Sequence, residues 1–431
     1  MKYDDIRGIL RYVPQFRGQT FIVLIDSGIV EHENMANVML DLAVLHSLSI
    51  KLVVVFGARH QITDLAAKRG ISLTNADATG VTDEVTLEVA LDAISRLTTD
   101  LMQQLTVVGL RAGVANAIAA HPAGVIRGRD LGSTGTIDRV DAQSLKLFIG
   151  DGMVPIIPPL GYEKQGRVLR VNSAATAVEV AIALGASKLL FVGPGAIEDA
   201  QGTRIRQLSV DEAKALAAPA ASGSLPRESV DGLKQVQIRH AARACEGGVP
   251  RAHFLDGRTD DALLGELFSI EGVGTMIYAD AYQQIRPAKK ADIPGIIGLV
   301  RRAVDDEEIV ARSRQEIRDR LGDYFVLEVD GQLVGTVMVR PYPGEKLAEV
   351  GFLHIRRSHE GMGYGRKLVK FAEKRARDVG AKILFALSTQ AYNYFGNKLG
   401  FLPAQEDLLP PDRLEKLRKS GRNSRLMARV L

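Results

Sequence analysis

A strand that leads through a glycine-rich loop into a helix constrains this chain more than any other stretch. The apolar run 350–355 is followed by Gly361, Gly363 and Gly365, and residues 366–379 then repeat apolar side chains at helical spacing. A glycine-rich turn that opens a helix presents successive backbone N–H groups at the positive end of the helix dipole, which suits a pyrophosphate. The pattern is not the dinucleotide fingerprint, because no acidic residue follows on a second strand about 20 residues later.

This loop resembles the acyl-CoA loop of the GNAT acetyltransferases, whose pattern Arg/Gln-x-x-Gly-x-Gly/Ala reads here as Glu360-x-x-Gly363-x-Gly365. Glu360 departs from the usual Arg or Gln, which removes a side-chain contact but leaves the backbone amides. Three glycines in a turn are often only a turn, and the order of strand, loop and helix favours the ligand. The resemblance implies acetyl-CoA as co-substrate, bound by Phe352, Leu353, His354, Ile355, Glu360, Gly361, Met362, Gly363, Tyr364, Gly365 and Arg366.

Size and composition narrow the class of protein. A chain of 431 residues exceeds what one hydrophobic core usually serves, so two or three domains are expected. Hydrophobic residues make up 46% and charged residues 25%, as in ordinary globular proteins. Lys+Arg 55 nearly balance Asp+Glu 51, and no basic block occurs, which argues against nucleic acid as a partner.

The sequence also shows no signal peptide, no membrane-spanning segment and no cluster of metal-ligating residues. Its single cysteine, Cys245, permits no internal disulfide and indicates a reducing compartment. Its start has no apolar signal region, and no segment approaches the ~18 apolar residues needed to span a bilayer. The eight histidines form no spaced cluster with cysteine or carboxylate. We therefore expect a cytoplasmic protein with no metal site and no membrane partner.

The first two thirds of the chain alternate strands with helices. Strands are predicted at 20–25, 51–56, 154–157, 188–192 and 251–255, and helices at 35–48, 82–105, 141–150, 174–184 and 233–246. Such alternation predicts an α/β domain with a mainly parallel sheet between helices. Residues 213–227 are interpreted as the end of a helix followed by a flexible loop.

The pattern changes near residues 282–287. Helices are predicted at 292–304 and 314–320, strands at 324–329, 332–340 and 348–355, and final strands at 382–387 and 400–401. Asp330-Gly331 is a strong hairpin turn signal between the first two of these strands. With the glycine loop, this order is the one that the GNAT fold requires. The expected division is a first domain over 1–280, a linker over 281–287 and a GNAT domain over 288–431.

The first domain resembles the amino-acid kinase fold, above all the acetylglutamate kinases. Residues 53–62, Val-Val-Val-Phe-Gly-Ala-Arg-His-Gln-Ile, resemble their strand and glycine loop, and residues 267–275 resemble the segment that binds arginine in the inhibitable forms. An amino-acid-kinase-like domain followed by a GNAT domain is the plan of the bacterial N-acetylglutamate synthases. Local matches at 17–21, 31–34, 45–48 and 421–424 extend this resemblance along nearly the whole chain.

The resemblance implies a function. It is the transfer of acetyl from acetyl-CoA to the amino group of L-glutamate, the first step of arginine biosynthesis, with feedback inhibition by L-arginine. The first domain would sense arginine and mediate self-association, commonly as a homohexamer, although tetramers also occur. The effector residues implied are Glu271, which suits a guanidinium, Gly272 and Gly274, which allow close backbone approach, and Tyr12. Tyr12 and Phe16 either close this site or pack against a neighbouring subunit.

Three residues that depart from the kinase pattern predict that the first domain transfers no phosphate. Leu24 stands where the kinases carry a lysine, and Asp26 adds a carboxylate that would repel a triphosphate. Ala174 replaces an aspartate that organises the catalytic lysines. A purely structural scaffold is the alternative to a retained amino-acid pocket.

Acetyl transfer to an amine needs a base, a donor to the thioester oxygen and an acid for the CoA thiolate. By resemblance, Glu349 is the base and Ser388 the general acid. From the sequence alone, a solvated strand-end carboxylate is the less favoured alternative for Glu349. Amides around 352–354 would polarise the thioester. Tyr392 and Tyr394 are rivals of Ser388, because many GNAT enzymes use a tyrosine somewhat further on.

The two carboxylates of glutamate require at least two cations, preferably arginines. Arg312 and Arg422 are favoured by match to the family, while Arg314 is interpreted as a solvated residue at a helix start. Two alternatives stay open. Instead of the glutamate reaction, the chain could catalyse acetyl transfer to another amine, with an amino-acid-sensing first domain, or it could be a non-catalytic amino-acid sensor. The intact glycine loop together with Glu349 disfavours the second.

Overall fold

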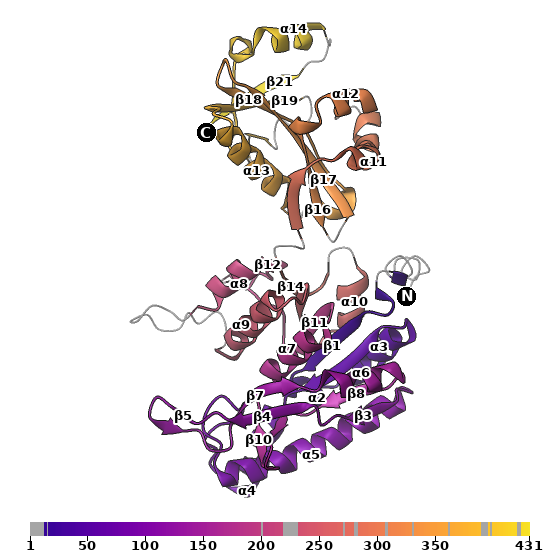
Figure 1. The fold of residues 1–431 in the computed structure, drawn as a ribbon, viewed down its shortest axis with the longest axis vertical. Coiled ribbons are helices and arrows are strands. Elements are labelled where there is room, and N and C mark those ends of the chain that lie inside the picture. Colours follow the sequence, from indigo (N-terminus) through magenta and orange to yellow (C-terminus); the bar gives the residue numbers. More distant parts are fainter. Residues whose placement is uncertain are drawn as a thin grey trace. The chain divides into compact units, whose positions relative to one another are not determined.

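The computed structural model describes residues 13–14, 16–199, 201–218, 232–269, 272–279, 283–306, 309–329, 332–360, 363–388, 395–396, 399–419 and 424–431. The chain divides into two compact units, Met1–Asp280 and Ala281–Leu431, which are described one at a time (Figure 1). Among the described residues, no helix combines the length and the apolar character that crossing a bilayer requires.

The first unit is built on an eight-stranded sheet in which every neighbouring pair is parallel except β13 with β14. From edge to edge its strands are β12 (Gln207–Ser209), β14 (Thr275–Tyr278), β13 (Arg251–Asp256), β11 (Lys188–Gly193), β1 (Thr20–Ile25), β2 (Lys51–Phe56), β8 (Val154–Ile157) and β3 (Ala112–Val114). The central strands β1, β2 and β8 are almost continuously apolar because both faces of the sheet are covered.

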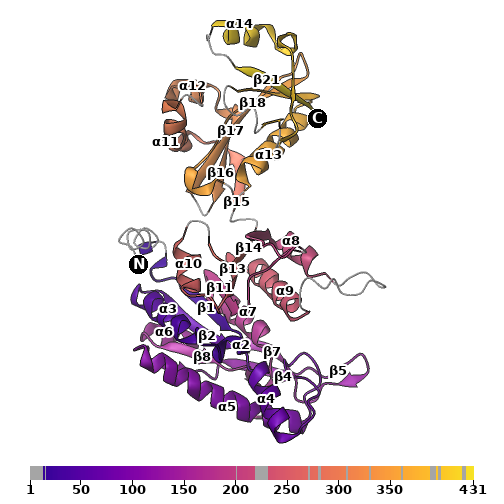
Figure 2. The ribbon, with the colours of Figure 1, turned by 180° about the vertical axis from the view of Figure 1, so that it is seen from behind.

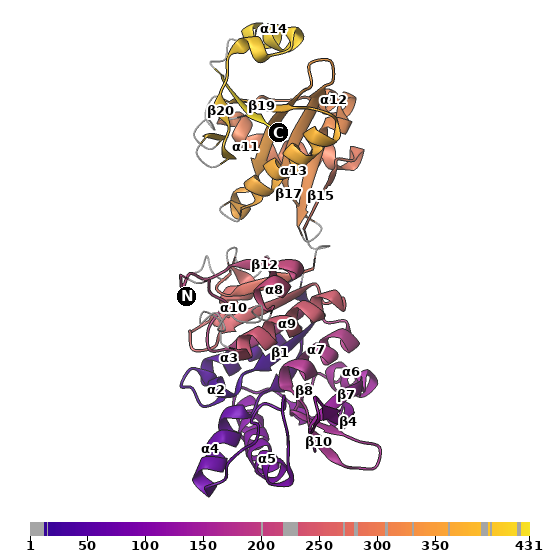
Figure 3. The same cartoon turned by 90° about the vertical axis from the view of Figure 1, so that its left-hand side faces the viewer.

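Helices cover the two faces of this sheet, as the view in Figure 3 shows. One face packs against α3 (Met35–Ser47), α4 (Arg59–Arg69), α5 (Glu84–Val107) and α10 (Ala262–Phe268). The other packs against α6 (Ala142–Gly150), α7 (Ser173–Leu184), α8 (Val210–Leu216) and α9 (Gly232–Glu246). A four-residue helix, α2 (Ser27–Val30), follows β1 directly. Alternate residues of β1 enter the two cores, so both faces of the strand contribute to stability.

A second, smaller sheet in this unit was not predicted. Its order is β10 (Val168–Arg170), β9 (Leu160–Tyr162), β4 (Ile118–Pro122) and β7 (Gly135–Val140), and a separate ribbon joins β5 (Val125–Ile126) to β6 (Arg129–Asp130). These strands are short and partly exposed, so they lack the continuous apolar runs that marked the central strands.

The second unit is a seven-stranded sheet flanked by helices (Figure 2). Its order is β15 (Gln283–Pro287), β16 (Tyr324–Val329), β17 (Gln332–Tyr342), β18 (Leu347–Ile355), β19 (Ile383–Ser388), β21 (Arg425–Val430) and β20 (Leu402–Pro403). All neighbours are antiparallel except β18 and β19. One face packs against α13 (Tyr364–Asp378), the other against α11 (Ile293–Asp305), α12 (Arg314–Asp319) and α14 (Pro411–Lys419).

The predicted α/β class is confirmed for both units. The strands predicted at 20–25, 51–56, 154–157 and 324–329 have those bounds in the structure. The strand predicted at 400–401 is wrong, because the strand begins at Leu402 and Gly400 has φ +69°. Asp330 and Gly331 lie outside the described residues, between the paired Val329 and Gln332.

Candidate active site

In the second unit, the parallel strands β18 and β19 are paired at one end and diverge at the other. They pair at Leu347↔Ile383, Ala348↔Leu384 and Glu349↔Phe385, and the ladder ends there although β18 runs on to Ile355. On its other side, β18 carries a bulge against β17, and Phe352 there has φ +50°. A bulge turns peptide groups away from the regular ladder. The sheet therefore opens at the part of β18 where acetyl-CoA was predicted to bind, at Phe352, Leu353, His354 and Ile355.

Glu349 lies at the point where the two strands part and is only 4% exposed. Arg413 of α14 holds its carboxylate in a bidentate pair, with Nη2 donating to Oε1 at 2.7 Å and Nε to Oε2 at 2.9 Å. The hydroxyl of Tyr342 donates to Oε2 at 3.1 Å. A carboxylate offers about four acceptor positions, so Oε1 retains room for one further hydrogen. Glu349 is therefore not the solvated strand-end carboxylate that its sequence position alone allowed.

Charge around this carboxylate is concentrated. Burial raises the pKa of Tyr342 to about 12, and the neighbouring Glu349 carboxylate adds to that shift. Burial opposes the charge of Arg340, but Glu349 and a hydrogen bond to Asp323 outweigh it and raise its pKa. Burial acts in the same way on Arg413, whose pKa is raised by its bond to Glu349. Both guanidiniums therefore stay charged beside a neutral phenol.

Arg312 lies on the Tyr324 side of the same region. Burial raises the pKa of the Tyr324 phenol, and the nearby Arg312 charge partly opposes that rise. The rings of Tyr324 and Phe352 pack edge-on, with their centres 5.5 Å apart. Glu316 is the ion-pair partner of Arg312 at 3.5 Å. Arg314 is exposed, as a solvated helix-start residue should be. Arg422 lies outside the described residues.

Arg413 is the functional candidate that sequence reasoning missed. It sits on α14, 64 residues from Glu349, in a charged stretch that matches no motif. The only local signal is Pro411 at the start of that helix, which fixes where Arg413 enters the fold.

The glycine loop leads into α13 as predicted. Gly363 is the N-cap of this helix with φ +79°. Among the described residues, no side chain caps the helix, and a Cβ at this position would meet nothing within 4 Å. Open space in front of a helix start fits a bound phosphate group. The side chain of Tyr364 is buried in the core, Glu360 is exposed, and Gly365 and Arg366 lie in the first turn. Gly361 and Met362 lie outside the described residues.

Ser388 is the last residue of β19 and pairs with Arg425 of β21. Side chains alternate along a strand, so Ser388 lies on the opposite face from Phe385, the partner of Glu349. The predicted base and the predicted acid therefore lie on opposite faces of the sheet, beside the point where β18 and β19 part. Tyr392 and Tyr394 lie outside the described residues.

In the first unit, a buried carboxylate organises the segment that was predicted to bind arginine. Glu266, only 5% exposed at its side chain, accepts the amides of Val273 and Gly274, each at 2.7 Å. A Cβ at Gly272, where φ is +64°, would lie 2.7 Å from this carboxylate, and one at Gly274 would lie 2.3 Å from the Phe254 carbonyl. Both glycines are therefore required by close packing. Glu271 and Tyr12 lie outside the described residues.

A chain of polar contacts continues from Glu266. Burial lowers the pKa of His253 to about 4, and nearby Lys188 contributes, so the imidazole is neutral and its Nδ1–H donates to Glu266 at 2.6 Å. Its Nε2 accepts from Lys188 Nζ at 3.3 Å, and that ammonium lies 5.1 Å from the ring centre of Phe16. Burial opposes ionisation of Glu266, yet the bonds to His253 and the amides lower its pKa to about 2. Sequence reasoning named Phe16 but missed Lys188, His253 and Glu266.

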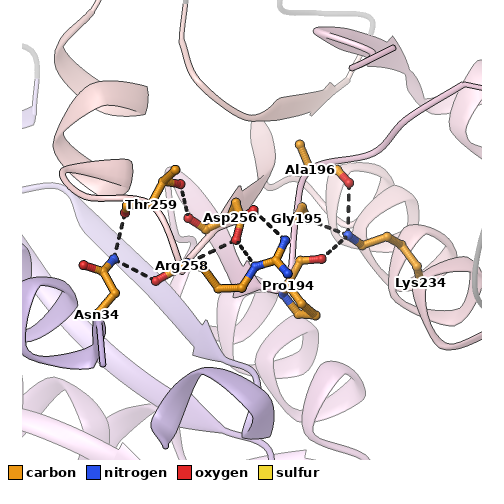
Figure 4. A network of polar contacts seen from close by, with 9 residues as sticks. Asn34, Pro194, Gly195, Ala196, Lys234, Asp256, Arg258 and Thr259 are labelled. Atoms are coloured by element: carbon orange, nitrogen blue, oxygen red, sulfur yellow. Dashed lines mark hydrogen bonds and ion pairs between the residues drawn. The ribbon is translucent and has the colours of Figure 1, made fainter. Parts of the chain in front are cut away.

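The kinase-like substitutions have structural roles. Leu24 is buried in the core, Ala174 is 4% exposed, and Asp26 accepts the Gly28 amide to cap α2. Nearby, Lys234 of α9 donates to the carbonyls of Pro194, Gly195 and Ala196 (Figure 4). The exposed Glu31 and His60 and the partly buried Asp64 bring three possible metal-ligand atoms within 4.8 Å of one another, which the sequence spacing did not reveal.

Comparison with known proteins follows the division of the fold. Residues 23–256 match the amino acid kinase family and residues 296–401 the acetyltransferase (GNAT) family. An amino-acid acetyltransferase of Actinobacillus pleuropneumoniae serotype 7 (strain AP76) is 32% identical over 410 residues, which cover 94% of this chain and 93% of that protein. The chain belongs to the amino-acid acetyltransferase family. The predicted enzyme class is confirmed.

Solved structures agree with this family. N-acetylglutamate synthase from Neisseria gonorrhoeae, complexed with coenzyme A and L-arginine, is 30% identical, with a TM-score of 0.80 over 100% of both chains. The same enzyme complexed with coenzyme A and N-acetyl-glutamate is 31% identical, with a TM-score of 0.64 over 100% of both chains. This chain, in which the amino acid kinase match precedes the GNAT match, therefore aligns with both structures along its whole length.

Proposed function

We propose that this member of the family transfers the acetyl group of acetyl-CoA to the amino group of L-glutamate, as the first step of arginine biosynthesis. The observation that carries the proposal is the buried Glu349 carboxylate, held by Arg413 where β18 and β19 part. The open helix start at Gly363 supports a CoA pyrophosphate in the same unit. The bound CoA and N-acetyl-glutamate of the N. gonorrhoeae enzyme support the choice of substrates.

The proposed chemistry needs only proton transfers and one acyl exchange. Glu349 accepts a proton from the substrate ammonium through Oε1, and the freed amine attacks the thioester carbonyl. Backbone amides of β18 near the bulge stabilise the oxyanion. The C–S bond then breaks, and the thiolate takes a proton from Ser388 or from one of the tyrosines at 392 and 394. The second proton of the attacking nitrogen, released as the amide forms, restores the proton of that acid. Arg312 and Arg413, with Arg422, supply the cations that two substrate carboxylates require.

We further propose a division of labour between the units. Residues 288–431 carry acetyl transfer, residues 281–287 link the units, and residues 1–280 bind L-arginine and assemble the protein into a homohexamer, which mass photometry tests. The Glu266–His253–Lys188 chain beside Gly272 and Gly274 supports a charged amino acid as the effector. The protein would act in the cytoplasm.

A spectrophotometric assay of CoA release tests the reaction. The full-length protein is incubated with acetyl-CoA and, in turn, each of the protein amino acids, with and without L-arginine. We expect L-glutamate to be the preferred acceptor and arginine to inhibit. A preference for another amino acid would support acetyltransferase activity but contradict glutamate as the substrate. If no amino acid stimulates CoA release, the proposed enzyme activity is wrong, and the protein would instead be a non-catalytic amino-acid sensor.

Removing the charge of Glu266 should uncouple the enzyme from arginine. Glu266→Gln keeps the shape but can no longer accept both amides and the His253 N–H equally well, so the loop around Gly272–Gly274 loosens. Loss of one charge-assisted bond, about 1.5–3 kcal/mol, raises the arginine concentration for half inhibition at least about tenfold. Acetyl transfer without arginine should be unchanged. Glu212→Gln, in an exposed helix cap, is the matched control. Wild-type inhibition in Glu266→Gln would remove this loop from the effector site.

A further inference from the structure

A partly buried tyrosine in the second unit contacts the predicted base, and the acetyl-transfer steps proposed above give it no role. Tyr342 is the last residue of β17. Its hydroxyl donates to Oε2 of Glu349 at 3.1 Å, and Glu349 is only 4% exposed. Burial raises the pKa of Tyr342 to about 12, so the phenol is neutral at physiological pH and keeps its proton for this hydrogen bond.

The register of the sheet brings Tyr342 to this carboxylate. Arg340 of β17 lies directly opposite Glu349 of β18, and Tyr342 lies two residues further along, opposite Leu347. Residues two positions apart share one face of a strand, so the phenol reaches Glu349 diagonally. The Tyr342 ring also packs against Phe385, the partner of Glu349 on β19, with ring centres 5.9 Å apart. Its position is therefore fixed by both strands that flank the base.

Arg340 holds the phenol from the other side. Opposite charges that face each other across two strands attract, and Arg340 lies opposite Glu349. Its Nε nevertheless donates to Asp323 Oδ2 at 3.2 Å, and the guanidinium also forms a hydrogen bond with the Tyr342 oxygen. The phenol oxygen thus accepts from Arg340, while its hydrogen is directed at Glu349.

The two oxygens of Glu349 are occupied unequally. Oε2 accepts Nε of Arg413 at 2.9 Å and the Tyr342 hydroxyl at 3.1 Å, whereas Oε1 accepts only Nη2 of Arg413, at 2.7 Å, among the described residues. Each carboxylate oxygen has two lone pairs. With both positions on Oε2 filled, a substrate ammonium has one place to donate, which is the second lone pair of Oε1.

We propose that Tyr342 is a positioning residue for acetyl transfer: its hydroxyl, held by Arg340, fills Oε2 of Glu349 and so directs Oε1 to the substrate nitrogen. The inference rests on the proposed role of Glu349 as the base. Tyr342 exchanges no proton with the substrate and acts only through the carboxylate. A hydrogen bond donated to an ionised carboxylate also favours the ionised form, so the phenol helps to keep the base active as pH falls.

Tyr342→Phe in the full-length protein tests this role, because it removes the hydroxyl and keeps the ring against Phe385. We expect kcat to fall roughly tenfold, as when one hydrogen bond to a charged group is lost, with the KM for the amino acid near the wild-type value. The acid limb of the kcat/KM profile should move to higher pH. Tyr162→Phe is the matched control and should change neither quantity, since the described residues give its hydroxyl no hydrogen bond.

A ring-fluorinated tyrosine at position 342 gives a second readout of opposite sign. Fluorine makes the phenol more acidic and hence a stronger donor, and the raised pKa of Tyr342 leaves it neutral at physiological pH. The acid limb should then move to lower pH. This variant keeps the hydroxyl and also decides the question if Tyr342→Phe does not fold. An acid limb that stays at the wild-type pH in the fluorinated protein, or in folded Tyr342→Phe, would overturn the proposal.

A double variant separates this proposal from the role of Glu349 itself. If Tyr342 acts only through the carboxylate, Tyr342→Phe should cause no further loss of kcat in a Glu349→Gln background. Losses that multiply would show that the phenol acts elsewhere, and the positioning role would be wrong while Glu349 remains the base. Near wild-type turnover in Glu349→Gln alone would instead reject the base, and the proposed mechanism with it.

Discussion

Replacing Glu349 by Gln is expected to lower kcat by about 10²–10⁴-fold, with little change in affinity for acetyl-CoA. The amide has nearly the shape of the carboxylate but cannot accept the ammonium proton. Its NH₂ group would also face the N–H donors of Arg413, which now hold both carboxylate oxygens. Steady-state kinetics at neutral pH, with acetyl-CoA affinity measured separately by calorimetry, give the two quantities.

The ion pair with Arg413 makes a control necessary, because the loss of activity in Glu349→Gln could also come from a displaced Arg413 guanidinium rather than from a lost base. Arg413→Met should mainly raise the KM for the amino acid if Arg413 binds a substrate carboxylate. A lost base also has its own signature in pH. Below the pKa of the substrate amine, each pH unit raises the fraction of free amine about tenfold. The kcat of Glu349→Gln should therefore increase towards the wild-type value as pH rises. A variant with near wild-type turnover at neutral pH would remove Glu349 from the mechanism.

The elements that the sequence predicted well share a local cause. β1 and β2 are runs of β-branched and aliphatic residues bounded by turn residues, and both faces of each strand are buried. Nothing distant in the chain is needed to recognise them. Helix α7 was likewise marked by small and apolar residues after Asn172, whose side chain caps it through the Ala175 amide. Periodicity and capping are readable because they involve residues one to four positions apart.

The site residues that sequence reasoning missed share the opposite property. Arg413 meets Glu349 across 64 residues, and Lys188 meets His253 across 65. None of these residues has a neighbour in sequence that reveals its partner. The prediction of Glu349 came from its place before the glycine loop, and its bidentate ion pair could come only from the folded chain. Glu266 shows the same limit, since the glycines were visible in sequence and the carboxylate that holds them was not.

The glycine loop provides the second large effect. Gly363→Val should weaken acetyl-CoA binding at least roughly a hundredfold, because two lost charge-assisted hydrogen bonds at about 1.5 kcal/mol each give that factor. The space in front of Gly363 is open, so a branched side chain there would occupy the position of the pyrophosphate rather than collide with the protein. Calorimetric titration with CoA measures the loss, while arginine binding in the same protein should persist.

Backbone strain complicates this variant, and a second substitution separates the two causes. Gly363 has φ +79°, where valine is disfavoured, so Gly363→Val should also unfold at lower temperature. Asparagine tolerates a left-handed backbone and still projects a side chain into the open space. Gly363→Asn should therefore keep a Tm near that of the wild type and lose CoA affinity. If both variants are folded and bind CoA as tightly as the wild type, the loop is a structural turn, and the pyrophosphate must be held elsewhere along β18 and α13.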